Sequence, residues 1–182
     1  RAGEHFRPNA VKEDHVPKEL KTFLRPYSYV IAIGGGVTTP QILRTLQLYY
    51  FGGPKWTPKI PELITCGDGP CRFFKCMLWR LQPGQTATVG DILEELKDDH
   101  PFEKVSYEIG LRWFITNPGE HLRTQQETIM ILPPEPLVLN GKSQALLFEA
   151  GAEAPVVLLE SVDLDQPFPK GWEWLTAMEL KD

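Results

Sequence analysis

Proline and glycine divide this chain into short segments, and this limits its fold more than any other feature. The 182 residues include 17 prolines and 15 glycines. Both residue types interrupt regular elements, because proline lacks a backbone N–H and glycine readily adopts turn conformations. The sequence therefore predicts short strands and helices joined by many turns, in a chain long enough for one sizeable core.

Several segments have the alternation, or the β-branched and aromatic content, that is typical of strands. The expected strands are Tyr27–Ile33, Val105–Thr116, Thr128–Leu132, the arms 137–139 and 144–148 of a hairpin turning at Asn140-Gly141, and Val156–Val162. Val105–Thr116 is the clearest of them, because apolar residues occupy every second position from Val105 to Ile115. Cys71–Leu81 is apolar enough for either a buried strand or a short helix.

Helices are expected where a capping residue precedes an apolar stripe. Thr39 caps a helix with Pro40 at its first position, and Thr88 with Asp91 resembles a capping box for a helix through Lys97. Trp172–Leu180 is expected to be a short terminal helix or a tail.

The predicted fold is α+β, an antiparallel sheet with two or three packed helices. It forms a single globular domain over residues 27–182, preceded by an extended polar N-terminal arm over residues 1–26.

The charge of the chain is divided between its two halves. Residues 1–90 carry 12 Lys and Arg against 6 Asp and Glu, whereas residues 91–182 carry 7 against 18, for a formal net charge of −5. A chain polarised in this way has a complementary partner in a second copy of itself, so a head-to-tail oligomer is expected. The net acidity argues against direct binding of nucleic acid.

Two segments are candidates for contact surfaces. The arm carries residues that can supply binding affinity, namely Val11, Val16, Pro17, Leu20, Phe23 and Leu24. Residues 52–70 are expected to form a long loop, in which Trp56 between Lys55 and Lys59 is typical of a membrane-surface or protein-docking element. The alternative is a Trp56 side chain folded back onto the core.

The glycine cluster and the acidic cluster of the sequence both have simple structural interpretations. Gly34-Gly35-Gly36 lacks the spacing of a dinucleotide-binding or Walker loop, so it is expected to be a tight turn between a strand and a helix. The acidic residues between Asp91 and His100 are expected to form the solvated face of a helix. No cofactor and no metal site are predicted.

The three cysteines are expected to be free thiols. Cys66, Cys71 and Cys76 are spaced too widely for a usual zinc site. An enzymatic alternative uses a thiolate at Cys66 or Cys71 with His100 or His121 as the base. An odd number of cysteines fits a reducing compartment.

Hydropathy predicts a location in the cytoplasm or at the inner membrane surface. No apolar run approaches the roughly 20 residues that cross a bilayer, so no transmembrane segment is expected. No signal peptide is visible, so secretion is not expected.

The first 50 residues resemble the matrix proteins of rhabdoviruses, particularly those of the lyssavirus type. The resemblance consists of an arm carrying Val16-Pro-Lys-Glu-Leu20, a strand, a Gly-rich turn, and a helix bearing Ile42-Leu-Arg44-Thr-Leu46. The Pro-Pro-x-Tyr budding motif and the polybasic N-terminus of that family do not occur in this sequence. The resemblance implies a viral matrix protein of virion assembly that self-associates, engages an anionic membrane surface and condenses a nucleoprotein. It also implies that residues 8–24 act as a donor arm on the next copy, and residues 52–59 as a membrane or docking element.

The expected function is that of a non-enzymatic, self-assembling structural protein that acts through its surfaces. Two alternatives stay open. One is a protein-binding module for a cellular partner, which adds a strand to an exposed sheet edge. The other is a small cytosolic enzyme with a cysteine nucleophile.

Overall fold

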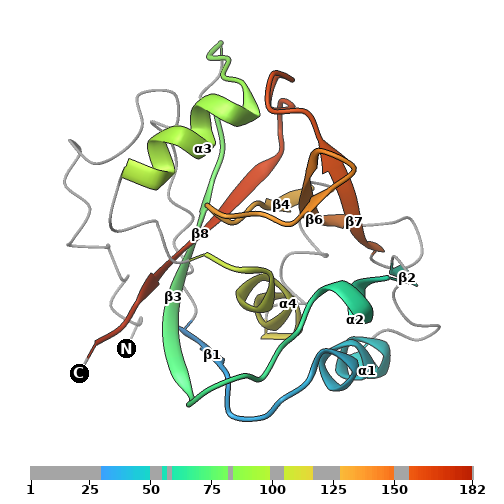
Figure 1. Ribbon diagram of the computed structural model, residues 1–182. Coiled ribbons are helices and arrows are strands. Elements are labelled where there is room, and N and C mark those ends of the chain that lie inside the picture. Colours follow the sequence, from blue (N-terminus) through green and yellow to red (C-terminus); the bar gives the residue numbers. More distant parts are fainter. Residues whose placement is uncertain are drawn as a thin grey trace.

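The computed structural model describes residues 30–49, 55–56, 59–81, 84–98, 105–116, 128–149 and 156–181. These residues contain one mixed sheet in the order β1-β3-β8-β4-β6-β7-β2, with β5 paired to β6 (Figure 1). The strands are β1 (Val30–Ile33), β2 (Lys55–Trp56), β3 (Arg72–Trp79), β4 (Ile129–Ile131), β5 (Val138–Leu139), β6 (Lys142–Glu149), β7 (Val156–Val162) and β8 (Glu173–Glu179). The predicted α+β fold is confirmed. The sheet is antiparallel except at two pairings, β2 with β7 and β4 with β8, which are parallel.

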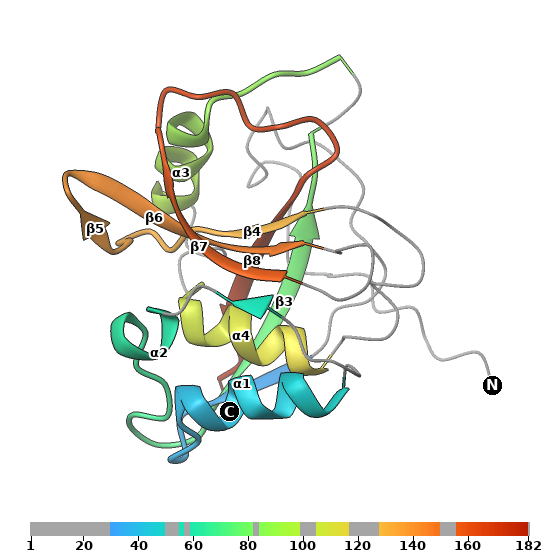
Figure 2. The same ribbon diagram turned by 90° about the vertical axis from the view of Figure 1, so that its right-hand side faces the viewer.

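Helices cover both faces of this sheet. On one face lie α1 (Thr39–Tyr49), α2 (Ile60–Leu63) and α4 (Tyr107–Thr116), and on the other lies α3 (Val89–Asp98) (Figure 2). Two hydrophobic cores result. The larger lies on the side of the sheet that carries α1, α2 and α4, and the smaller lies between the sheet and α3.

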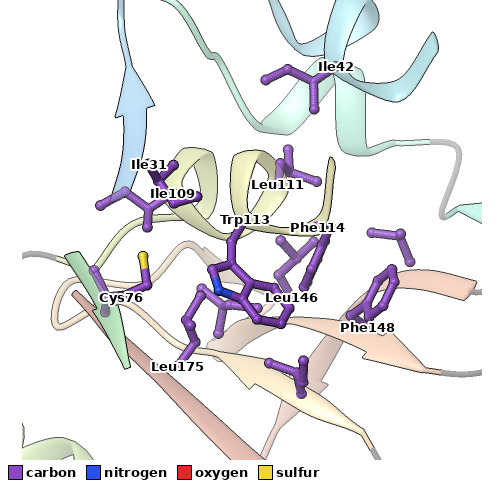
Figure 3. Close-up of a cluster of buried hydrophobic side chains, with 14 of the residues drawn as sticks. Ile31, Ile42, Cys76, Ile109, Leu111, Trp113, Phe114, Leu146, Phe148 and Leu175 are labelled. Carbon is purple, nitrogen blue, oxygen red and sulfur yellow. The ribbon is translucent and has the colours of Figure 1, made fainter. Parts of the chain in front are cut away.

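The segment Val105–Thr116, expected as the clearest strand, is instead the helix α4 from Tyr107 onward. The helix is buried on two opposite sides, because it lies between α1 and the sheet. Figure 3 shows Trp113 directed toward Leu146 and Leu175 of the sheet, with Ile42 of α1 on the opposite side of the helix. A helix buried on two sides needs no polar face, so its apolar residues also match the alternation of a strand.

The segment Trp172–Leu180, expected as a helix or tail, forms β8 in the interior of the sheet. It pairs with β3 on one side and with β4 on the other. Residues Glu173–Ala177 are all buried, because both faces of this strand are covered. A strand buried on both faces shows no alternation, which explains the wrong prediction. The expected strand at 128–132 is present as β4, and it pairs with β6 and β8.

Local turn chemistry agrees with the sequence in several places. Asn140 and Gly141 both have positive φ, 52° and 76°, as the hairpin between β5 and β6 requires. The backbone N–H of Asp91 donates to the Thr88 hydroxyl over 3.1 Å, which confirms the expected cap of α3. The apolar segment after Cys71 is resolved as a strand, β3.

The first helix begins differently from the prediction. Thr38, not Thr39, is the capping residue, since its carbonyl accepts the first helical hydrogen bond from the Ile42 N–H over 3.1 Å. The Gln41 side chain accepts a hydrogen bond from the Thr38 N–H over 2.9 Å. The hydroxyl of the buried Thr39 instead donates to the Ile64 carbonyl over 2.6 Å, which ties α1 to the chain after α2. A second threonine one position away left the sequence signal ambiguous.

Candidate functional site

Two glycine turns from distant parts of the sequence are joined to each other. Gly34, Gly35 and Gly36 all have positive φ, and so do Gly67 and Gly69. The Gly35 N–H donates to the Gly69 carbonyl over 3.1 Å, and the Gly36 N–H donates to the Gly67 carbonyl over 2.9 Å. The first cluster is therefore the tight turn between β1 and α1 that the sequence predicts.

A carboxylate from α4 holds both turns. Oε1 of Glu108 accepts the N–H of Gly34 over 3.0 Å and the N–H of Gly67 over 2.9 Å. Strand-to-helix turns rich in glycine can bind anions through such N–H groups. Here the anion is a side chain of the protein itself, so the turn is internally satisfied. Nothing in the sequence pointed to Glu108, because it lies 74 positions from Gly34 within a segment read as a strand.

The same carboxylate lies near the thiol of Cys66, which is buried. Burial raises the pKa of Cys66 to about 11, and the negative charges of Glu108 and Asp68 add to this effect. A hydrogen bond with Thr39 and the positive charge of Arg112 oppose it. Nucleophilic cysteines have lowered pKa values, so this environment argues against a catalytic thiolate at Cys66.

Of the remaining catalytic candidates, Cys71 alone lies in the described part of the chain. Cys71 is exposed, and burial raises the pKa of Cys76 to about 12. His100 and His121 lie outside the described residues. Within the described part of the chain, no three His, Cys, Asp or Glu side chains gather to form a metal site.

The expected docking loop contains regular structure. Residues 55–56 form β2, which pairs with Val156 and Val157 of β7 at one edge of the sheet. Lys59 is exposed and directly precedes α2, where a proline in the first turn favours the helix. The prediction of an unbroken loop over residues 52–70 was therefore wrong, whereas the docking role of Lys55, Trp56 and Lys59 stays a prediction. The arm residues Val11, Val16, Pro17, Leu20, Phe23 and Leu24 lie outside the described residues.

A group of exposed apolar side chains lies where β1, β3 and the end of β8 adjoin. Val30, Phe73 and Leu180 are 52%, 49% and 41% exposed. Phe73 pairs with Ala32 of β1, and its carbonyl accepts the N–H of Leu180 over 2.9 Å. Val30 lies opposite Lys75, two positions beyond Phe73, so all three side chains project from the same face of the sheet. We call these three residues the sheet-face patch.

Acidic side chains gather on the same face, around α3. Asp91 and Glu94 of α3 are exposed, as are Asp163 and Asp165 in the connection from β7 to β8. The Gly90 N–H donates to the Leu164 carbonyl over 2.7 Å, which holds that connection against the start of α3. We call these four residues the acidic surface. Lys170, in the same connection, is also exposed, and the exposed basic residues Arg44 and Lys59 lie on the opposite side of the sheet, with α1 and α2.

No family model matches this chain, and no curated protein or solved structure matches it either. None of the described helices is long and apolar enough to cross a membrane.

Proposed function

We propose that this protein is a non-enzymatic structural protein that associates with further copies of itself, with the sheet-face patch as a contact surface. The observation that carries the proposal is the grouping of Val30, Phe73 and Leu180 on one face. They are three of the five exposed large hydrophobic residues of the described chain. Scattered apolar residues are ordinary on a surface, whereas adjacent ones are typical of interaction sites.

The sheet-face patch has the composition of a contact centre. Aromatic residues dominate the binding energy of many interfaces, and Phe73 lies between two aliphatic side chains. Full burial of a Phe, Val or Leu side chain contributes about 1.5–3 kcal/mol each. Since each side chain of the sheet-face patch is already about half buried, its contribution to association is about half of that value.

The acidic surface supports a head-to-tail arrangement. It lies on the same face of the sheet as the sheet-face patch, so one partner segment with basic and apolar residues can contact both. The first 29 residues of the chain contain such a mixture, with six Lys or Arg against four Asp or Glu, and the apolar arm residues. Complementary charge of this kind mainly sets the association rate and the orientation of the partner.

The resemblance to rhabdovirus matrix proteins extends the proposal. On that basis the assembled copies bridge an anionic membrane surface and a nucleoprotein, and Lys55, Trp56 and Lys59 contact the membrane. A basic and aromatic segment suits an anionic lipid surface, because the cations are attracted to the headgroups and the indole ring lies at the interface.

Light scattering over a concentration series, at low and at high salt, tests the proposed self-association. We expect a mean mass that rises with protein concentration and falls as salt screens the acidic surface. A constant monomer mass at every concentration and salt would contradict the proposal. It would leave a binding module for a different protein as the better interpretation.

A further inference from the structure

The strand β1 lies at the end of the sheet, and part of its outer edge is occupied by side chains of α4. β1 pairs only with β3 among the described strands. Edge strands expose backbone N–H and C=O groups that can pair with another chain, and proteins protect such edges in specific ways.

The direction of the backbone groups of β1 follows from the hydrogen bonds of β3. The carbonyl of Phe73 accepts the Leu180 N–H, so Phe73 directs its backbone groups toward β8. Ala32, opposite Phe73 in the antiparallel pair, therefore directs its N–H and C=O away from β3. Val30 and Gly34, two positions to either side, do the same.

Two side chains one helical turn apart on α4 occupy these outward groups. Nε of Arg112 donates to the Ala32 carbonyl over 2.7 Å, and Oε1 of Glu108 accepts the Gly34 N–H over 3.0 Å. Both side chains are half-buried, so these charge-assisted hydrogen bonds are only partly exposed to competing water.

We propose that Arg112 and Glu108 form a lock on the outer edge of β1, which prevents the addition of a second copy's β1 to the sheet. The edge is self-complementary. In an antiparallel pair related by a two-fold axis, the Ala32 N–H of one copy donates to the Val30 carbonyl of the other. The Val30 N–H donates in return to the Ala32 carbonyl, the atom that Arg112 occupies. The lock thereby directs self-association to the sheet-face patch and away from a two-fold dimer formed by strand addition at β1.

The test starts from Phe73→Ser, which removes the aromatic side chain of the sheet-face patch. In that background, Arg112→Met removes the guanidinium donors and keeps an aliphatic stem against the neighbouring side chains. Arg44→Met on the exposed face of α1 is the matched control. Sedimentation velocity should show a new species of twice the mass for F73S/R112M, and no change for F73S/R44M.

Ala32→Pro tests the location of the new contact. Its N–H faces outward, so proline removes a donor that an added strand needs without removing a bond to β3. F73S/R112M/A32P should return to the mass of F73S. An unchanged mass for F73S/R112M would overturn the lock, and so would a doubled mass that Ala32→Pro does not reverse.

Ala32→Pro in the wild-type protein provides a second measurement. The mass should stay unchanged, because the lock already closes this edge of β1. A lowered mass would overturn the proposal even without the Arg112 variant. The lock and the proposed function are tested by different comparisons. Equal masses of wild type and F73S would refute association through the sheet-face patch. The comparison of F73S with F73S/R112M would still show whether the lock prevents strand addition.

Discussion

Glu108 and Gly67 lie 41 positions apart and are joined by a hydrogen bond of 2.9 Å from the glycine N–H to the carboxylate Oε1. The same oxygen accepts the Gly34 N–H, so one side chain of α4 fixes the turn after β1 and the turn before β3. Helix α4 thus organises the end of the sheet at which the sheet-face patch lies.

Replacing Glu108 should loosen this end of the sheet. Glu108→Ala leaves two backbone N–H groups without their acceptor, and we expect a loss of about 2–4 kcal/mol in the free energy of unfolding. Glu108→Gln keeps an acceptor oxygen at the same position and should cost only about 1 kcal/mol. Urea denaturation of both variants measures the difference. Equal losses would show that charge, and not the hydrogen bonds, is what matters.

The glycines of the first turn should differ in their tolerance of alanine. A Cβ at Gly34 would lie 2.3 Å from the Pro70 carbonyl oxygen, whereas at Gly36 it would meet nothing within 4 Å. Both positions have positive φ. Gly36→Ala should therefore cost about 1–2 kcal/mol for the backbone conformation alone. Gly34→Ala should cost more than about 3 kcal/mol, because a backbone carbonyl must also move. The melting temperatures of the two variants, measured at equal protein concentration, test this difference.

The three thiols should react with an alkylating reagent in a fixed order. Cys71 is exposed and should react first in the native protein, whereas Cys66 and Cys76 should react only on unfolding. With a pKa of about 11, roughly one Cys66 side chain per thousand is a thiolate at pH 8. Mass spectrometry of peptides after timed alkylation gives the order. Rapid modification of Cys66 at neutral pH would restore the enzymatic alternative.

The raised pKa of Cys66 also predicts how stability depends on pH. The pKa rises from 9.0 to about 11 on folding, so the folded state favours the neutral thiol. This contribution is fully present below pH 9 and is lost as the pH rises toward 11, because the unfolded state ionises first. Between these values the wild type should lose more stability than Cys66→Ala. Urea denaturation of both proteins between pH 9 and pH 11 measures this difference. Equal losses in the free energy of unfolding would contradict the prediction.

The sequence predicts those parts of the fold whose structure is determined by a few adjacent residues. The turn at Asn140-Gly141 requires positive φ, and the cap at Thr88 depends on Asp91, three residues later. Both features could therefore be predicted from a few adjacent residues. In contrast, α4 and β8 are buried on opposite sides, and burial of this kind removes the periodicity that separates helix from strand.

The candidate site was less accessible to sequence reasoning than the fold. Gly34 and Gly67 could be recognised as turn residues, but the contact of both with Glu108 depends on the position of α4. The sheet-face patch likewise arises from β1, β3 and the residue that follows β8, and only the pairing of Phe73 with its neighbours reveals it. Contacts across long sequence separations leave no local pattern in a single chain.

Sedimentation velocity of the wild type and of Phe73→Ser, over the same concentration series, tests the central claim most directly. Phe73 is 49% exposed, so its replacement by serine should leave the fold intact, as circular dichroism can verify. We expect the wild type to shift to larger species as the concentration rises, and F73S to remain a monomer. Identical behaviour of the two proteins would contradict self-association through the sheet-face patch.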